Sequence, residues 1–136
     1  METAVDSIGG TWINQHGSRL HLRCDLDGRL SGSYSTTKGR AASGKQYPLI
    51  GQLNGEVFAF QVNWVDESEN LAAITSFSGR LGRDPQGQPC LHTLWVLTRQ
   101  FEDAERTRPT GVWNAFLTNV DVFTRLEDCE RRGIEM

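Results

Sequence analysis

Hydrophobic and polar residues alternate with a period of two along most of the chain. The clearest run is EVFAFQVNW at 56–64, in which Phe58, Phe60 and Val62 share one parity with Trp64. This alternation is typical of β-strands with one buried face. Seven further runs show a similar pattern or the same turn boundaries: 10–15, 18–24, 29–36, 46–53, about 72–80, 88–99 and 119–126. The pattern therefore predicts eight short strands.

Short turns and polar loops separate these runs. DLDG follows the second run, DPQG precedes the seventh, and the dipeptide Asn54-Gly55 is typical of a tight hairpin. The longer connections are polar, at 37–45 and about 100–111. Evenly spaced strands of this kind form a sandwich or a barrel. An eight-stranded antiparallel up-and-down β-barrel closes on itself and leaves room for one small ligand, and it is the all-β fold that we predict.

The seventh run, 88–99, is apolar on both parities. Trp95 and Leu97 follow the inner parity, whereas Leu94 and Val96 follow the outer one. Apolar side chains on the outer face of a barrel favour a partner surface, so we expect an oligomer.

Composition and charge narrow the class of protein. The chain has 136 residues, 38% of them hydrophobic, and a formal net charge of -3. This length suits one domain, and the acidic balance argues against a general nucleic-acid binder. No run approaches the roughly 20 apolar residues of a membrane helix. METAVDSIGG does not have the pattern of a signal peptide, so the sequence assigns no compartment.

The cysteines do not form a recognisable motif. Cys24, Cys90 and Cys129 lie far apart without a CxxC pair, and the three histidines are scattered. We therefore expect neither a metal site nor a cofactor. The strands that carry Cys24 and Cys90 are not neighbours in a meander, so both are expected to be buried free thiols. Cys129 could cross-link chains on oxidation.

Several polar side chains fall on the parity of the large apolar residues, or next to it: Asn14, Ser18, Tyr34, Thr36, Thr75 and Asp121. Aromatic residues share that side: Trp12, Trp64, Phe77 and Trp95. Polar groups that converge within an aromatic wall are typical of a small-ligand site. Polar groups paired with one another inside a barrel core are an equally good interpretation of this pattern alone.

Ordered motifs along the chain resemble the avidin and streptavidin family. GTWINQHGS at 10–18 and GRLSGSYST at 28–36 are similar to the opening of that family, and the match continues through VNW at 62–64, TSFSG at 75–79, TLWVLTR at 93–99, Trp113 and DVFTRL at 121–126. The resemblance implies the eight-stranded barrel and tight, non-covalent, non-enzymatic binding of biotin at its open end. It also divides the chain into an extension (1–8), a barrel domain (9–126) and a charged tail (127–136).

The resemblance assigns the polar residues to the ureido ring of biotin. Asn14, Ser18 and Tyr34 would donate hydrogen bonds to the ureido oxygen. Asp121 would accept a bond from one ureido N–H, and Thr36 from the other. Three donors on one oxygen stabilise negative charge on it, as in an oxyanion hole.

The same resemblance assigns the rest of the pocket. Thr75 would lie against the thioether sulfur. The remaining wall of the ring and the valeryl chain would consist of Trp64, Phe77, Trp95 and Leu97. Ala73 stands where many family members have a serine that bonds the ligand carboxylate. Backbone N–H groups of the 37–45 loop would then bind the carboxylate, and Lys38 and Arg40 could add attraction. The residues whose backbone N–H groups would bind the carboxylate are Ala41, Ala42 and Ser43.

Trp113 matches a tryptophan that closes a neighbouring subunit's pocket in tetrameric family members. Its presence, together with the outward Leu94, Val96 and Val120, favours a homotetramer.

Three other functional classes remain as alternatives, and one of them is an oligomeric structural protein whose pocket is blocked. A lipocalin-like carrier of another small ligand would have an apolar lumen, which the inner polar residues disfavour. An enzyme would need an activated nucleophile, and His21 and His92 both follow the outer parity.

Overall fold

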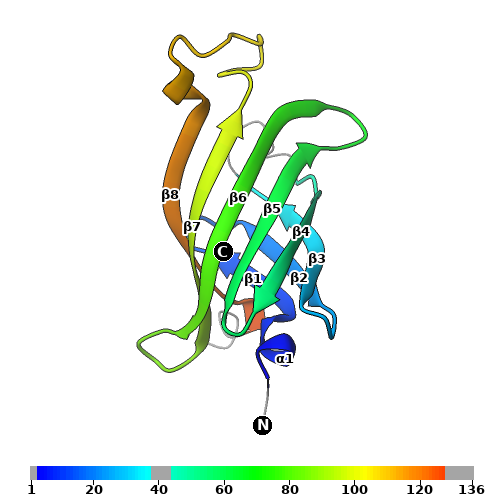
Figure 1. Cartoon of the computed structure of the whole chain (residues 1–136), viewed down its shortest axis with the longest axis vertical. Helices are drawn as coiled ribbons and strands as arrows, with labels where there is room; N and C mark the ends of the chain where they lie inside the picture. The colour runs from blue at the N-terminus through cyan, green and yellow to red at the C-terminus, as the bar shows by residue number, and fades with distance from the viewer. Residues whose placement is uncertain (1–2, 38–43, 128–136) are drawn as a thin grey trace.

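Eight antiparallel strands form one closed barrel in sequence order (Figure 1). The computed structural model describes residues 3–37 and 44–127. The strands are β1 (Gly10–Asn14), β2 (Arg19–Cys24), β3 (Arg29–Ser35), β4 (Tyr47–Asn54), β5 (Val57–Val65), β6 (Asn70–Arg83), β7 (Pro89–Arg99) and β8 (Phe116–Arg125). Trp12 of β1 pairs with Arg125 of β8, which closes the barrel. The predicted fold is confirmed.

Two strands are longer than the sequence pattern predicted. β6 runs from Asn70 to Arg83, and β8 begins at Phe116 rather than at residue 119. The start of β8 is fixed by pairing with β7, where Thr98 lies opposite Phe116. Phe116 and Leu117 are both apolar and both exposed, so no alternation marks this part of the strand.

The inner face of the barrel holds an aromatic core. Phe60 and Phe77 are stacked with ring centroids 4.6 Å apart, and Tyr34 lies 5.7 Å from Phe77. Gly32 in β3 has a φ of +150°, and a side chain there would run into the carbonyl oxygen of His21 on β2. This glycine therefore permits the close approach of β2 and β3.

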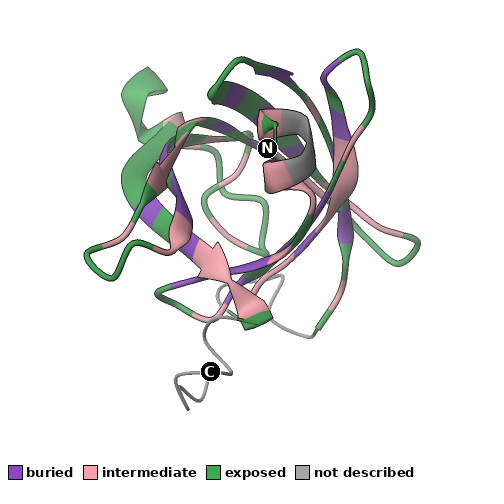
Figure 2. Cartoon of the chain, turned by 90° about the horizontal axis from the view of Figure 1, so that it is seen from below, coloured by how far each residue is buried: buried purple, intermediate pink, exposed green. Residues whose placement is uncertain are grey.

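A short helix covers one end of the barrel. α1 (Ala4–Ile8) lies at the lower end of the barrel in Figure 1, and in Figure 2, which looks from below, it lies in front of the barrel opening. Ile8 is fully buried in the core, and its carbonyl oxygen accepts a 2.9 Å bond from Nε1 of Trp12. Arg125 donates to the carbonyl oxygens of Ser7 and Gly9, and its guanidinium lies 4.5 Å from the Trp12 ring centroid. The N-terminal segment thus packs against the barrel, which the strand pattern did not indicate.

The outer face of β7 and β8 carries a row of apolar side chains. Leu94, Val96 and Val120 are 54%, 38% and 57% exposed, as predicted from their parity. Other large apolar side chains that are exposed and share this outward direction on β6 and β8 are Ile74, Phe116 and Val122. We refer to these six residues as the outer apolar face.

Cys24 and Cys90 are unpaired, and their strands are not neighbours. Cys90 is buried as expected, but Cys24 is only partly buried because it ends β2 next to an exposed turn. Burial raises the pKa of both thiols. Cys129 lies outside the described residues.

Within the described part of the chain, no three metal-ligating side chains gather in one place. None of its helices is long and apolar enough to cross a membrane.

Candidate functional site

A cavity of about 580 Å³ is lined by residues at and beyond the ends of β1, β3, β5 and β7. In Figure 1 the ends of the labelled strands β5 and β7 lie at the opposite end of the barrel from α1. The cavity is lined by the predicted residues Ser18, Tyr34, Thr36, Trp64, Ala73, Thr75, Phe77, Trp95, Leu97 and Asp121. It is also lined by residues that were not predicted: His16, Leu71, Arg99, Phe101 and Glu102. The cavity lies at the end where β1, β3, β5 and β7 finish, so inward residues from successive strands converge on it.

The floor of the cavity is polar and centres on Asp121, which is bonded to Asn14; Asn14 itself is not among the lining residues. Nδ2 of Asn14 donates to Oδ2 of Asp121 at 3.1 Å, and both side chains are buried. Oδ1 of Asn14 accepts bonds of 2.9 Å from the backbone N–H groups of His16 and Ser18. The β1–β2 turn therefore fixes the orientation of the amide and directs its N–H₂ group toward Asp121.

A second amide holds the other oxygen of Asp121. Nε2 of Gln15 donates to Oδ1 of Asp121 at 3.2 Å, while its Oε1 accepts a 3.0 Å bond from the N–H of Val122. The carboxylate is thus bonded by two side-chain amides, as a buried charge requires. Sequence reasoning missed Gln15 because it follows the last residue of β1 and is exposed.

Tyr34 and Ser18 complete the floor. Burial raises the pKa of Tyr34 to about 12; the nearby charge of Asp121 also raises it, and bonds with Ser18 and Asn14 oppose the shift. The phenol is therefore a neutral hydrogen-bonding group at neutral pH. Oγ of Ser18 donates to Oγ1 of Thr36 at 3.1 Å, so two hydroxyls from neighbouring strand ends meet at this floor.

The walls of the cavity are aromatic. Phe77 of β6 lies directly opposite Trp95 of β7, and Trp64 makes an edge contact with Tyr34 at 5.7 Å. Nε1 of Trp64 donates to Oγ1 of Thr75 at 2.9 Å. Nε1 of Trp95 is buried, and no described residue accepts a hydrogen bond from it.

The mouth of the cavity is formed by residues beyond these walls. Ala73 of β6 lies directly opposite Arg99 of β7, and both line the cavity. Arg99 shares the parity of Trp95 and Leu97, so the sequence pattern could have identified it. His16 and Phe101 lie outside the strands, where no period of two exists to indicate their direction.

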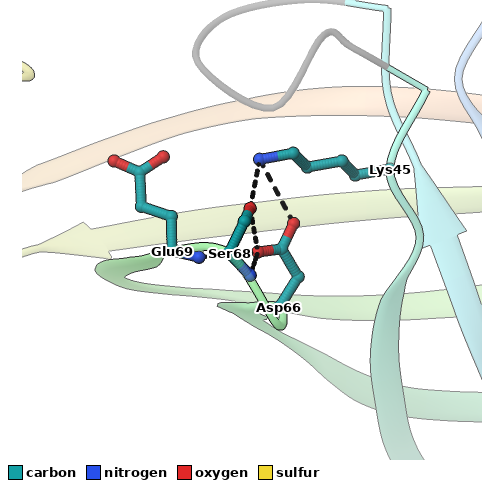
Figure 3. Close-up of polar contacts among 4 residues, drawn as sticks. All are labelled: Lys45, Asp66, Ser68 and Glu69. Atoms are coloured by element: carbon teal, nitrogen blue, oxygen red, sulfur yellow. Dashed lines mark hydrogen bonds and ion pairs between the residues drawn. The ribbon is translucent and has the colours of Figure 1, made fainter.

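A polar cluster joins two connections near this end of the barrel (Figure 3). Nζ of Lys45 lies 3.3 Å from Oδ2 of Asp66 and 2.9 Å from Oγ of Ser68. Oδ1 of Asp66 also accepts 2.8 Å bonds from the hydroxyl and N–H of Ser68 and from the N–H of Glu69. These bonds lower the pKa of Asp66 to about 2, and the bond from the Ser68 hydroxyl is the largest cause of the shift.

Comparison with known proteins agrees with this geometry. The Avidin family model matches residues 2–126. The chain belongs to the avidin family. The curated protein Afifavidin from Afifella pfennigii is 32% identical over 76 residues, which is 55% of this chain but 48% of that relative, so the match spans about half of the relative's length.

Solved avidin-like structures share the whole fold. The structure of apo shwanavidin superposes with a TM-score of 0.70 at 28% identity and covers 86% of this chain and 98% of its own. The rhizavidin–biotin complex gives a TM-score of 0.72 at 28% identity, with 87% and 92% of the two chains covered.

Of the predicted site residues that the structure describes, Asn14 and Trp113 are not among those that line the cavity. Trp113 belongs to η2 (Val112–Ala115), is 79% exposed and contacts Phe116 at a centroid distance of 5.6 Å. It does not line the cavity of its own chain. Ala41, Ala42, Ser43, Lys38 and Arg40 lie outside the described residues.

Proposed function

We propose that the chain binds biotin non-covalently in this cavity, with the ureido ring at the polar floor and the carboxylate at the mouth. The observation that carries the proposal is the buried Asn14–Asp121 pair, which lies with Tyr34 and Ser18 at the end of an aromatic-walled pocket. Membership of the avidin family and the likeness to a rhizavidin–biotin complex support it.

The floor matches the hydrogen-bonding pattern of a cyclic urea. Asn14, Ser18 and Tyr34 each carry a donor, and these three donors would meet the ureido oxygen. Asp121 would accept from one ureido N–H, and its charge makes that bond about twice as strong as a neutral one. Thr36 would accept from the other N–H.

The walls match the apolar parts of biotin. Trp64, Phe77 and Trp95 provide flat surfaces for the fused rings and the valeryl chain, and such surfaces contribute most of the apolar contact in small-ligand sites. The hydroxyl of Thr75, oriented by Trp64, would face the thioether sulfur. Leu97 continues this wall toward Ala73 at the mouth.

A lipocalin-like carrier fits this pocket less well. An apolar ligand would remove water from Asp121, Tyr34 and Ser18 without replacing its hydrogen bonds, which is costly for buried polar groups. Long-chain fatty acid in place of biotin therefore serves as the comparison ligand in the experiment below.

The proposal includes a homotetramer. The outer apolar face is large and exposed in the single chain, and such faces are typical of protein interfaces. Trp113, which lies in η2 just before β8 and is 79% exposed, would extend over a neighbouring subunit's pocket. Backbone N–H groups of Ala41, Ala42 and Ser43 would help to bind the carboxylate.

Isothermal calorimetry of the purified protein with biotin tests the function. We expect one biotin per chain, a strong rise in the melting temperature, because the ligand binds only the native state, and no comparable response to the fatty acid. Neither heat nor a thermal shift with excess biotin would contradict the proposal.

A further inference from the structure

The mouth of the cavity contains a guanidinium group that none of the roles above uses. Arg99 is the last residue of β7, and it lines the cavity together with Leu97 and Trp95 of the same strand. A cation at this position is placed to meet whatever part of a ligand lies outside the aromatic walls.

The pairing of β6 with β7 sets the depth of Arg99. Trp95 lies opposite Phe77, Leu97 opposite Thr75, and Arg99 opposite Ala73. Each pair is one step of about 6.8 Å nearer the mouth than the pair before it. Arg99 is therefore one step beyond the Leu97–Thr75 pair, where the acid end of an extended ligand tail would emerge. The methyl group of Ala73 offers no hydrogen bond there and leaves room for the longer side chain.

The guanidinium group is held in place but is not fully bonded. Nε and Nη2 of Arg99 donate to the carbonyl oxygen of Asn114 at 3.3 and 3.0 Å. A guanidinium group has five N–H donors, so these bonds leave others for a ligand. Within the described residues no carboxylate forms an ion pair with Arg99, although Glu102 lines the same mouth and reduces its net attraction for an anion.

We propose that Arg99 binds the carboxylate of the ligand and makes this pocket prefer a free acid over its amides. Arginine suits this role because its planar fork matches the geometry of a carboxylate. The inference rests on the proposed binding of biotin, and it assigns to Arg99 the contact that a serine in place of Ala73 would provide.

Arg99→Gln removes the charge and keeps a polar side chain of moderate length. Arg83→Gln is the matched control, because Arg83 also donates to a backbone carbonyl, that of Gly87, but at the opposite end of the β6–β7 pair. Dissociation rates of biotin and of biotin amide are measured for the parent chain and both variants. We expect Arg99→Gln to release biotin about tenfold faster and the amide at the parent rate, since a bond to a charged group is lost only with the acid.

The ratio of the two rates separates ligand contact from a purely structural role. If Arg99 only supports Asn114, its loss changes both rates equally and leaves the ratio unchanged, which overturns the inference. Arg99→Lys keeps the positive charge and is expected to keep part of the preference for the free acid over the amide. If Arg99→Lys loses this preference as completely as Arg99→Gln does, a charge-based contact with the acid is contradicted. If the parent chain binds neither ligand, the proposed function itself fails.

Discussion

Nδ2 of Asn14 donates to Oδ2 of Asp121 at 3.1 Å, although 107 residues separate the two in the sequence. Asn14 ends β1 and Asp121 lies in β8, the two strands whose pairing closes the barrel. The polar floor of the pocket therefore exists only in the closed barrel, and binding and folding depend on the same strand pair.

Asp121→Ala is expected to weaken biotin binding by about 1.5–3 kcal/mol, the range for a hydrogen bond to a charged group. The barrel should persist, because the variant also removes the free-energy cost of burying a charged carboxylate. The biotin dissociation rate measures the effect, and circular dichroism checks the fold. A dissociation rate equal to that of the parent would exclude Asp121 from the contact with the ligand.

The phenol of Tyr34 should remain a neutral group well above neutral pH. Its pKa in the folded protein is about 12, above the ordinary 10.0, so the stability that this shift contributes is complete below pH 10 and is lost as the pH rises through 12. We expect the Tyr34-dependent part of biotin binding to be constant from pH 7 to 10. Tyr34→Phe should release biotin roughly two- to tenfold faster throughout that range.

The pH series of the parent and of Tyr34→Phe are compared directly. A rise in the parent's dissociation rate centred near pH 10, absent from Tyr34→Phe, would show that the pKa of the phenol is not raised.

Thr75→Val keeps the shape of the side chain but removes the acceptor for Nε1 of Trp64. An indole N–H without its partner costs about 1–3 kcal/mol when buried, and Trp64 is only partly buried, so we expect about 1 kcal/mol less stability. Urea denaturation measures this loss. Thr75→Ser retains the hydroxyl, so it should keep most of the stability that Thr75→Val loses. Equal losses of stability in the two variants would show that the bond contributes nothing.

Ile8→Ala tests whether α1 is part of the folded barrel. Ile8 is fully buried, and truncation of a buried isoleucine costs about 2–5 kcal/mol. Val57→Ala, at a position that is 50% exposed, is the control and should have a much smaller effect. Equal denaturation midpoints for the two variants would mean that the barrel does not depend on the helix.

Trp113→Lys should weaken both assembly and biotin retention if this residue serves a neighbouring pocket. Light scattering of the parent chain is expected to give four times the chain mass of 15.2 kDa. A stable dimer of the parent would contradict the role of Trp113, and a monomer would contradict the interface as a whole. If the parent is a tetramer and Trp113→Lys changes the assembly but not the biotin dissociation rate, Trp113 contributes to the interface and not to the pocket.

The strands and their inward residues were predictable because a period of two is a local property. Each of Phe58, Phe60 and Val62 needs only its neighbours to define its side, and all three are buried. The same reasoning placed Thr75 and Asp121 on the inner face and Leu94 on the outer one. The ordered motifs then identified the family, because they span nearly the whole barrel.

Residues outside the regular strands could not be placed in this way. The period of two fails at the turn that carries His16 and in the connection that carries Phe101 and Glu102, so their position at the mouth depends on how the barrel brings these segments together. Ile8 was missed for the same reason: its burial depends on α1 lying across the far end of the barrel.

By itself the sequence determined the strand order, the inward and outward faces, the family and most of the lining residues. These follow from alternation, turn residues and motifs, all of which are local. Only the tertiary structure decided which groups touch: that Gln15 holds Asp121, that Trp64 bonds Thr75, and that Arg99 lies opposite Ala73. Such contacts depend on strand register and barrel closure, because a shift of one residue between strands would turn every side chain to the other face.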